Sequence, residues 1–188
     1  MAAPITPNST LTDVCFAVCT ALDAVGTIAV LTDGSAATYY APERYQSRDA
    51  DFILTMYRVR EAGPAALEQL GFCVGEDQIY RHERTKFTLE FPHGPLAIGA
   101  ELIKRYETVR RDDQVLHIIS RTDSVRDRLT AFFHWSDRSA LVTALGVAES
   151  GDIDLASIKA WSEREGEADK FREFSDRLRD DRRTGRDH

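Results

Sequence analysis

A pair of aspartates stands at the start of a segment that otherwise has the composition of a buried strand. In "DADFILT", Asp49 and Asp51 flank an alanine and precede a run of apolar residues. Aspartate is depleted in strands and is almost never fully buried unless it is paired or bound to a metal. Residues two apart in a strand point to the same face, so the two carboxylates are expected to project together. A fold that accepts this strand therefore needs positive charge beside it.

The chemistry of the pair predicts the kind of cation. Two neighbouring carboxylates repel, and one of them is protonated unless a cation compensates the charge. Ligands that are all oxygen favour Mg²⁺ or Mn²⁺ over zinc. A third acid is predicted in "KFTLEF", where the apolar side chains alternate onto one face and Glu90 falls on the other. Asp49, Asp51 and Glu90 are the predicted metal-binding and catalytic residues.

A glycine-serine turn precedes the acid pair. Gly34 and Ser35 follow the β-branched run "TIAVLT" and begin a short segment with helical character, "SAATYYA". Backbone N–H groups and a hydroxyl at the start of a helix can be aimed at a phosphate. An anion site beside a metal-binding acid pair is suited to phosphoryl or nucleotidyl transfer.

The order of predicted elements gives an α+β fold. A helix, a strand, a short helix, a strand and another helix are followed by several strands, including a hairpin at Asp112 and Asp113. After residue 120 the pattern becomes helical, with caps predicted at Thr122, Asp137 and Asp154. We expect a sheet domain over 1–120, a helical half over 121–178 packed on it, and a charged, disordered tail over 179–188.

Composition restricts the class of protein. The three cysteines of the 188-residue chain are odd in number and have no CxxC spacing, which argues against a disulfide framework or a cysteine zinc site. Cys15 and Cys19 are expected to be core residues of one helix. No apolar stretch is long enough to span a bilayer, and the first ten residues lack the pattern of a signal peptide, so we predict a cytoplasmic protein without membrane contact.

The charge balance leaves two interpretations open. A net charge of -7 disfavours indiscriminate binding to nucleic acid. Cations nevertheless cluster between Lys104 and Arg128, interleaved with acids. This cluster fits either a solvated face of mixed charge or a local basic groove.

The succession of strand, Gly-Ser, short helix, Asp-x-Asp and a later acid on a strand resembles the nucleotidyltransferase (polymerase β-like) superfamily. It is most similar to the small bacterial members, both minimal nucleotidyltransferases and those of the abortive-infection toxin type. The resemblance implies that Gly34 and Ser35 grip a triphosphate and that Asp49 and Asp51 bind two magnesium ions. It further implies that Glu90 helps to activate an acceptor hydroxyl.

The resemblance extends less closely into "SRTDSVRDRLTAFFHWSD". Arg128 stands where abortive-infection relatives have a basic residue near the nucleotide, and Asp137 matches an acid on the following helix. Arg48, next to the acid pair, fits either a phosphate contact or a solvated arginine. One departure is Asp33, which stands where many relatives have a glycine.

These observations predict a magnesium-dependent nucleotidyltransferase that moves NMP from an NTP onto a hydroxyl of a protein, an RNA or a small molecule. The resemblance adds a role in defence or in a toxin–antitoxin pair. Two alternatives remain open. One is a non-catalytic relative that binds a partner protein, or a second copy of itself, through the helical half. The other is a metal-dependent nuclease, which also needs clustered acids.

Overall fold

A mixed sheet with helices around it forms the protein, in agreement with the predicted α+β class. The computed structural model describes residues 4–57, 59 and 61–184. Seven strands are hydrogen-bonded in the order β3-β4-β5-β2-β1-β9-β8. Their bounds are β1 Thr27–Thr32, β2 Asp49–Tyr57, β3 Phe72–Val74, β4 Tyr80–His82, β5 Thr88–Glu90, β8 Glu107–Arg111 and β9 Gln114–Ile118. The helices before the last strand are α1 Leu11–Ala24, α2 Asp33–Tyr40 and α3 Ala62–Gln69.

Three adjacent strands in the middle of the sheet determine where the predicted acids lie. β2 runs antiparallel to β1 and parallel to β5. The register places Thr32 opposite Asp51, and Asp51 opposite Glu90. These residues therefore form one row across the sheet, at the point where β1 ends and α2 begins.

The first helix follows the sequence prediction closely. Thr10 caps α1 and forms a capping box with Asp13, in which each side chain bonds the backbone N–H of the other residue. Cys15 and Cys19 are buried in the apolar face of α1, as predicted, and are free thiols. This face packs against β1 and β9 and forms much of the core.

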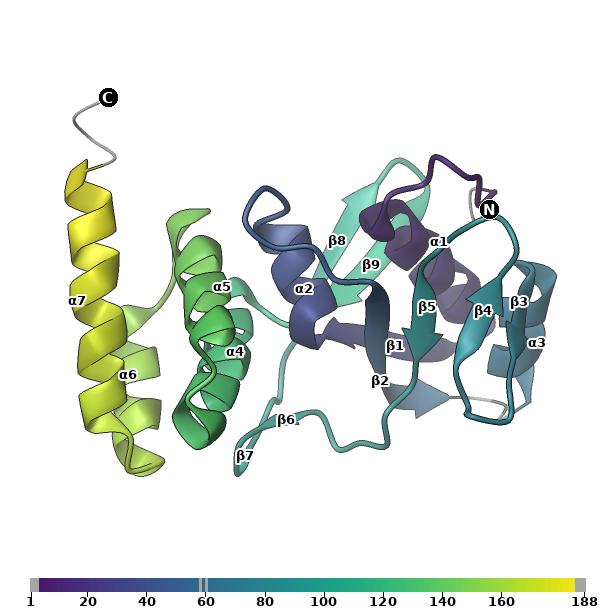
Figure 1. The fold of residues 1–188 in the computed structure, drawn as a ribbon. Helices are drawn as coiled ribbons and strands as arrows, with labels where there is room; N and C mark the ends of the chain where they lie inside the picture. The colour runs from purple at the N-terminus through teal and green to yellow at the C-terminus, as the bar shows by residue number, and fades with distance from the viewer. Residues whose placement is uncertain (1–3, 58, 60, 185–188) are drawn as a thin grey trace.

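The chain becomes helical after β9, as predicted, with α4 Arg121–Trp135, α5 Arg138–Glu149, α6 Leu155–Arg164 and α7 Ala168–Thr184. Figure 1 shows these helices stacked at one end of the molecule, with β3, β4 and α3 at the other end and α2 between. Asp137 and Asp154 cap α5 and α6, as predicted. The prediction for α4 was wrong, because its cap is Ser120 and not Thr122.

The predicted disordered tail over 179–188 was wrong for its first part. Helix α7 continues to Thr184, and residues 185–188 lie outside the described residues. Two features account for the longer helix. Leu178 is buried, which attaches this turn to the core, and Asp176 pairs with Arg179 one turn later.

A long connection between β5 and β8 crosses the sheet near the row of acids. It contains the two-stranded hairpin β6 Ala97–Ile98 and β7 Glu101–Leu102, which is separate from the main sheet. In Figure 1 the connection passes below β2 and α2 on its way to the helices. Among the described residues, no helix combines the length and apolar character needed to cross a bilayer.

Candidate functional site

The acids predicted from strand alternation share one face of the sheet. Ala50, which lies between the two aspartates in β2, and Leu89, which precedes Glu90 in β5, are fully buried on the opposite face. Asp49, Asp51 and Glu90 are only partly buried. Because paired residues in neighbouring strands point the same way, Asp51 and Glu90 are direct neighbours across the ladder. The sheet thus brings together the three residues that the sequence analysis assigned to a metal.

Asp51 is the acid most affected by its surroundings. The pKa of Asp51 rises to about 7, first because of burial and then because of the negative charges of Asp33, Asp49 and Glu90. The positive charge of Arg128 acts in the opposite direction and lowers this pKa. Asp33 contributes more to the shift than either Asp49 or Glu90 does. Burial and the neighbouring acids together therefore outweigh the compensation that Arg128 gives to Asp51.

Asp33 enters the cluster from the start of α2. Its backbone is left-handed, with φ 54°, a conformation that aspartate tolerates better than most residues. The side chain turns back so that Oδ1 accepts a hydrogen bond of 2.7 Å from the backbone N–H of Gly34. The same oxygen accepts a hydrogen bond from Arg128 Nη2. Asp33 therefore occupies the Gly34 N–H and the Arg128 guanidinium at the turn that the sequence analysis assigned to phosphate binding.

Arg128, which the sequence analysis assigned to the nucleotide, lies in α4 and pairs with Asp33. Its Nη2 also donates to Asp127 Oδ2 at 2.8 Å, so the guanidinium is held between two carboxylates. The side chain is only 13% exposed. Burial opposes its charge, but Asp127 and Asp33 outweigh this effect and raise the pKa of Arg128 above its usual value. Arg128 is a fixed cation at the site.

The hydroxyl of Ser35 is engaged inside the fold. It donates to the backbone carbonyl of Thr32 at 2.7 Å and accepts a hydrogen bond of 3.2 Å from the backbone N–H of Asp51. Ser35 is 1% exposed, so it ties the end of β1 to the acid strand. This is a structural role, and in this conformation the hydroxyl proton is already donated to Thr32.

Gly34 is buried beneath an aromatic side chain. A Cβ atom at Gly34 would lie 2.9 Å from the Tyr45 hydroxyl oxygen and 3.3 Å from Ser47 Oγ. Ser47 in turn donates to Asp49 Oδ1 at 3.0 Å. The small residue at position 34 thus lets the loop before β2 close over α2 and orient the first acid.

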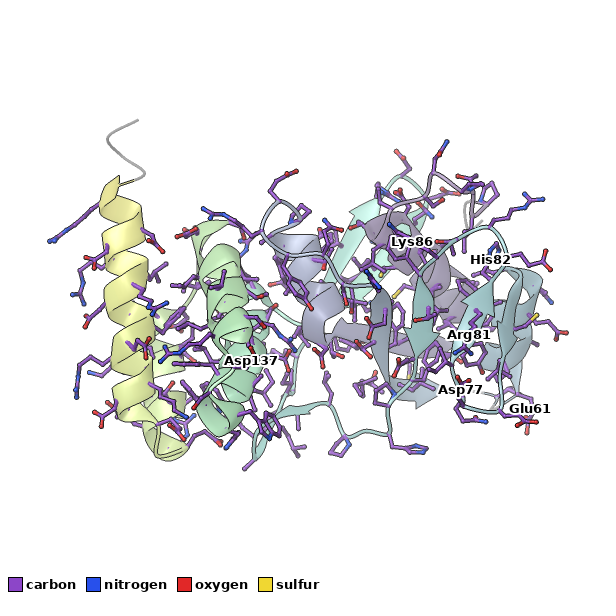
Figure 2. The ribbon with its side chains drawn as sticks, viewed as in Figure 1. Glu61, Asp77, Arg81, His82, Lys86 and Asp137 are labelled. Atoms are coloured by element: carbon purple, nitrogen blue, oxygen red, sulfur yellow. The ribbon has the colours of Figure 1, made fainter. Side chains whose placement is uncertain are left out.

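The two remaining predicted nucleotide residues lie at the margins of the site. Asp137 accepts hydrogen bonds from the backbone N–H groups of Ser139 and Ala140, and Figure 2 shows it on the helical part of the molecule. Bonds from Ser139 are the first cause of its lowered pKa, and the charge of Arg128 also contributes. Arg48 is exposed, and its backbone carbonyl accepts a hydrogen bond from Thr88.

A cleft of about 170 Å³ opens beside the acids. Asp33, Asp51 and Asp127 line it together with Thr32, and the other lining residues are apolar. The apolar part comes from β2, from the end of β9 and from the connection that carries β6 and β7. Its residues are Ile53, Pro92, Pro95, Leu96, Ala97, Ile98, Ile103 and Ile119. The cleft can therefore accept an apolar or flat group whose polar end meets the carboxylates.

The acid cluster has the right donor chemistry for a hard cation but is not closed around one. Within residues 4–57, 59 and 61–184, no three side chains of His, Cys, Asp or Glu are arranged to hold a metal ion. Asp49, Asp51 and Glu90 nevertheless share one face with oxygen donors only, which fits Mg²⁺ or Mn²⁺.

Sequence reasoning missed two members of the cluster. Asp33 appeared only as a departure from a familiar pattern, and Asp127 appeared only as one acid among the mixed charges before Arg128. Their link is the Arg128 guanidinium, which joins α2 to α4. A weak indication was present for Asp33, since an acid directly after a buried strand and before Gly-Ser is unusual.

Comparison with known proteins adds no relative to this description: no family model matches the chain, and neither does any curated protein or solved structure.

Proposed function

We propose that the chain is a metal-dependent nucleotidyltransferase that moves NMP from an NTP onto a hydroxyl acceptor. The observation that supports this most strongly is the row formed by Asp51 and Glu90, with Asp49 on the same face and excess negative charge around Asp51. A cluster that raises the pKa of one of its acids to about 7 costs folding stability, and such clusters concentrate at functional sites.

The residues divide into three roles in this proposal. Asp49, Asp51 and Glu90 would hold Mg²⁺ or Mn²⁺, which would supply charge stabilisation to the reacting phosphate. The N–H groups at the start of α2, together with Arg128, would bind the triphosphate. Glu90, at the edge of the row, would accept the proton of the acceptor hydroxyl.

The proposed reaction is an in-line transfer of the nucleotidyl group. The acceptor oxygen attacks the α-phosphorus of the NTP, and the bond from that phosphorus to the bridging oxygen of the β-phosphate breaks. Pyrophosphate leaves with the bonding electron pair, and the hydroxyl proton passes to the Glu90 carboxylate. The cleft beside Asp51 offers a place for an apolar part of the nucleotide or of the acceptor.

Glu90→Gln provides the test. This change keeps the size of the side chain and removes its charge, so we expect label transfer from NTP to fall by at least about a hundredfold, while the protein stays folded. Wild type and variant are incubated with labelled NTPs, magnesium and a cell lysate, and labelled acceptors are separated by class. Glu173→Gln on α7 makes the same chemical change at a distance from the acids and should leave transfer unaltered.

The results of this experiment separate the alternatives. Transfer at the wild-type rate by Glu90→Gln would remove Glu90 from the reaction. Breakdown of RNA without labelled product would indicate a nuclease.

A non-catalytic binding protein is the second candidate, and one observation favours it. The Ser35 hydroxyl and the Arg128 guanidinium, both assigned to the nucleotide, are already engaged within the fold. Wild-type protein that gives no labelled product with any NTP, yet retains a partner protein or forms a homodimer through its helical half, would support this reading.

A further inference from the structure

Asp33 occupies the place of an anion in the folded chain. Its Oδ1 receives one hydrogen bond from the N–H of Gly34, in the first turn of α2, and another from Arg128. A backbone N–H at a helix start and an arginine are the two kinds of donor that proteins commonly direct at phosphate. The protein thus presents its own carboxylate to a phosphate-type donor set.

The arrangement is specific to the geometry at position 33. The left-handed backbone lets the carboxylate fold back onto the next N–H group, whereas an extended residue would direct it elsewhere. Asp127 accepts hydrogen bonds from Nε and Nη2 of Arg128, so the guanidinium is fixed where Asp33 meets it. Asp33 itself is 55% exposed, in contrast to 13% for Arg128. The cation is built into the fold, and the carboxylate over it is accessible and can be displaced.

The Asp33 carboxylate lies close to other negative charges and repels them. Asp33 lines the cleft together with Asp51 and Asp127, so three acids face one small space. An incoming triphosphate would bring further negative charge to this place. Like charges brought together in an interface oppose binding, so the triphosphate gains most if Asp33 swings away and releases Gly34 and Arg128.

We propose that Asp33 is a built-in competitor for the nucleotide phosphate and sets a weak affinity at this site. In the resting protein Asp33 binds the Gly34 N–H and Arg128, and a triphosphate binds by replacing it on both donors. This inference rests on the proposed function, because it concerns the same triphosphate site.

Calorimetric titration of the purified full chain tests the proposal, with inorganic triphosphate and ATP as probes in the presence of Mg²⁺. Asp33→Asn keeps the shape of the side chain and removes its charge. We expect the Kd for both probes to fall by about tenfold or more. Asp33→Gly should show the same gain, and it should fold well because glycine is suited to the left-handed backbone at this position.

Asp77→Asn is the matched control. Asp77 also holds an arginine, Arg81, through two hydrogen bonds, and Figure 2 shows this pair at the opposite end of the molecule from the helical part. The substitution changes the net charge of the protein by the same amount, so the Kd should stay within about twofold of wild type.

Each result supports or overturns the proposal. Tighter binding by both Asp33 variants, with the control unchanged, supports it. Equal or weaker binding by the Asp33 variants, while wild type binds, overturns the competitor role and leaves the proposed function standing. Failure of wild type and all variants to bind either probe overturns both.

Discussion

Charged side chains are arranged in opposite ways at the acid cluster and along α7. On α7 each acid has a base three or four residues away, as in the pairs Asp169–Arg172, Glu173–Arg177 and Asp176–Arg179. At the end of β1 and the start of β2, by contrast, acids gather around Asp51, and Arg128 pairs with two of the nearby acids, Asp33 and Asp127. Positive and negative charges are balanced on the surface of α7, whereas negative charges predominate at the acid cluster.

The comparison shows where this chain gives up stability. Exposed ion pairs contribute little, so the arrangement on α7 mainly supports the helix and its solubility. Partly buried like charges raise the free energy of the folded state, and a neutral or apolar set of residues would fold more easily. A fold that keeps such a cluster is expected to use it, and a bound cation is the simplest use.

A large effect expected from this difference is stabilisation by metal. Magnesium that binds only the folded state should raise both the melting temperature and the unfolding free energy. At a magnesium concentration a hundred times its Kd, the gain in unfolding free energy should be about 2.7 kcal/mol. The double variant Asp49→Asn with Asp51→Asn should lose this response. The matched double variant on α7, Asp169→Asn with Asp176→Asn, should retain it. An equal magnesium-induced shift in all three proteins would contradict a metal site at the acids.

The next effect is the pH dependence of the stability of the metal-free protein. Asp51 has a pKa of about 7 in the fold, above the usual 3.8, so the folded state binds this proton more tightly than the unfolded chain does. The protonated Asp51 carboxyl therefore stabilises the folded state. This stabilisation is fully present below pH 3.8, the usual pKa, and is lost as the pH rises towards 7. We expect ionisation of this group to lower the unfolding free energy by about 4 kcal/mol between pH 4 and pH 8.

Urea unfolding in EDTA at a series of pH values measures this effect. Asp51→Asn should flatten the pH dependence and should be more stable than wild type at pH 8. An unaltered pH profile in Asp51→Asn would show that Asp51 ionises normally. With magnesium present, the wild-type loss of stability should shrink, because the cation favours the ionised carboxylate.

A smaller effect is expected where Ser35 joins the two strands. Ser35→Ala removes a buried hydroxyl that bonds Thr32 and Asp51, and should cost about 1 to 2 kcal/mol of unfolding free energy. Ser139→Ala, whose exposed hydroxyl bonds Asp137, is the control and should cost less. Chemical denaturation of both variants decides the matter. Equal stabilities would mean that Ser35 does not hold the strands together.

The smallest effect is expected on α7. Asp176→Asn removes one member of an exposed pair with Arg179 and should change the unfolding free energy by no more than about 0.5 kcal/mol. If Asp176→Asn lowered the unfolding free energy as much as Ser35→Ala does, the exposed ion pairs of α7 would contribute substantially to stability, contrary to this expectation. The same denaturation series supplies this measurement.

Much of the fold could be predicted because local patterns determine it. The alternation that puts Asp49 and Asp51 on one face depends only on strand geometry. The cap of α5 at Asp137 likewise follows from local chemistry. The first part of the tail was predicted wrongly because its composition is charged, whereas its spacing allows the Asp176–Arg179 pair and the residue directly before it, Leu178, is buried in the core.

The parts that could not be predicted depend on partners distant in sequence. Asp33 and Arg128 are 95 residues apart, and nothing local indicates that α4 will bring the arginine to the start of α2. The pairing of Asp51 with Glu90 depends on β5 joining β2, a choice made by the packing of the whole sheet. Ser35 could be recognised as part of a turn, but its two backbone partners follow from the tertiary structure.

Strand β2 consists of two mechanically different halves. From Asp49 to Asp51 it pairs with β5, and from Asp51 to Tyr57 it pairs with β1, so the two ladders overlap at Asp51. The second half also exposes Leu54 and Met56 to solvent. Pairing on both sides resists local opening, so fraying should begin in the exposed half and stop at Asp51. Asp51 thus lies where both neighbouring strands hold β2, and the exposed end of the strand can open without displacing its carboxylate.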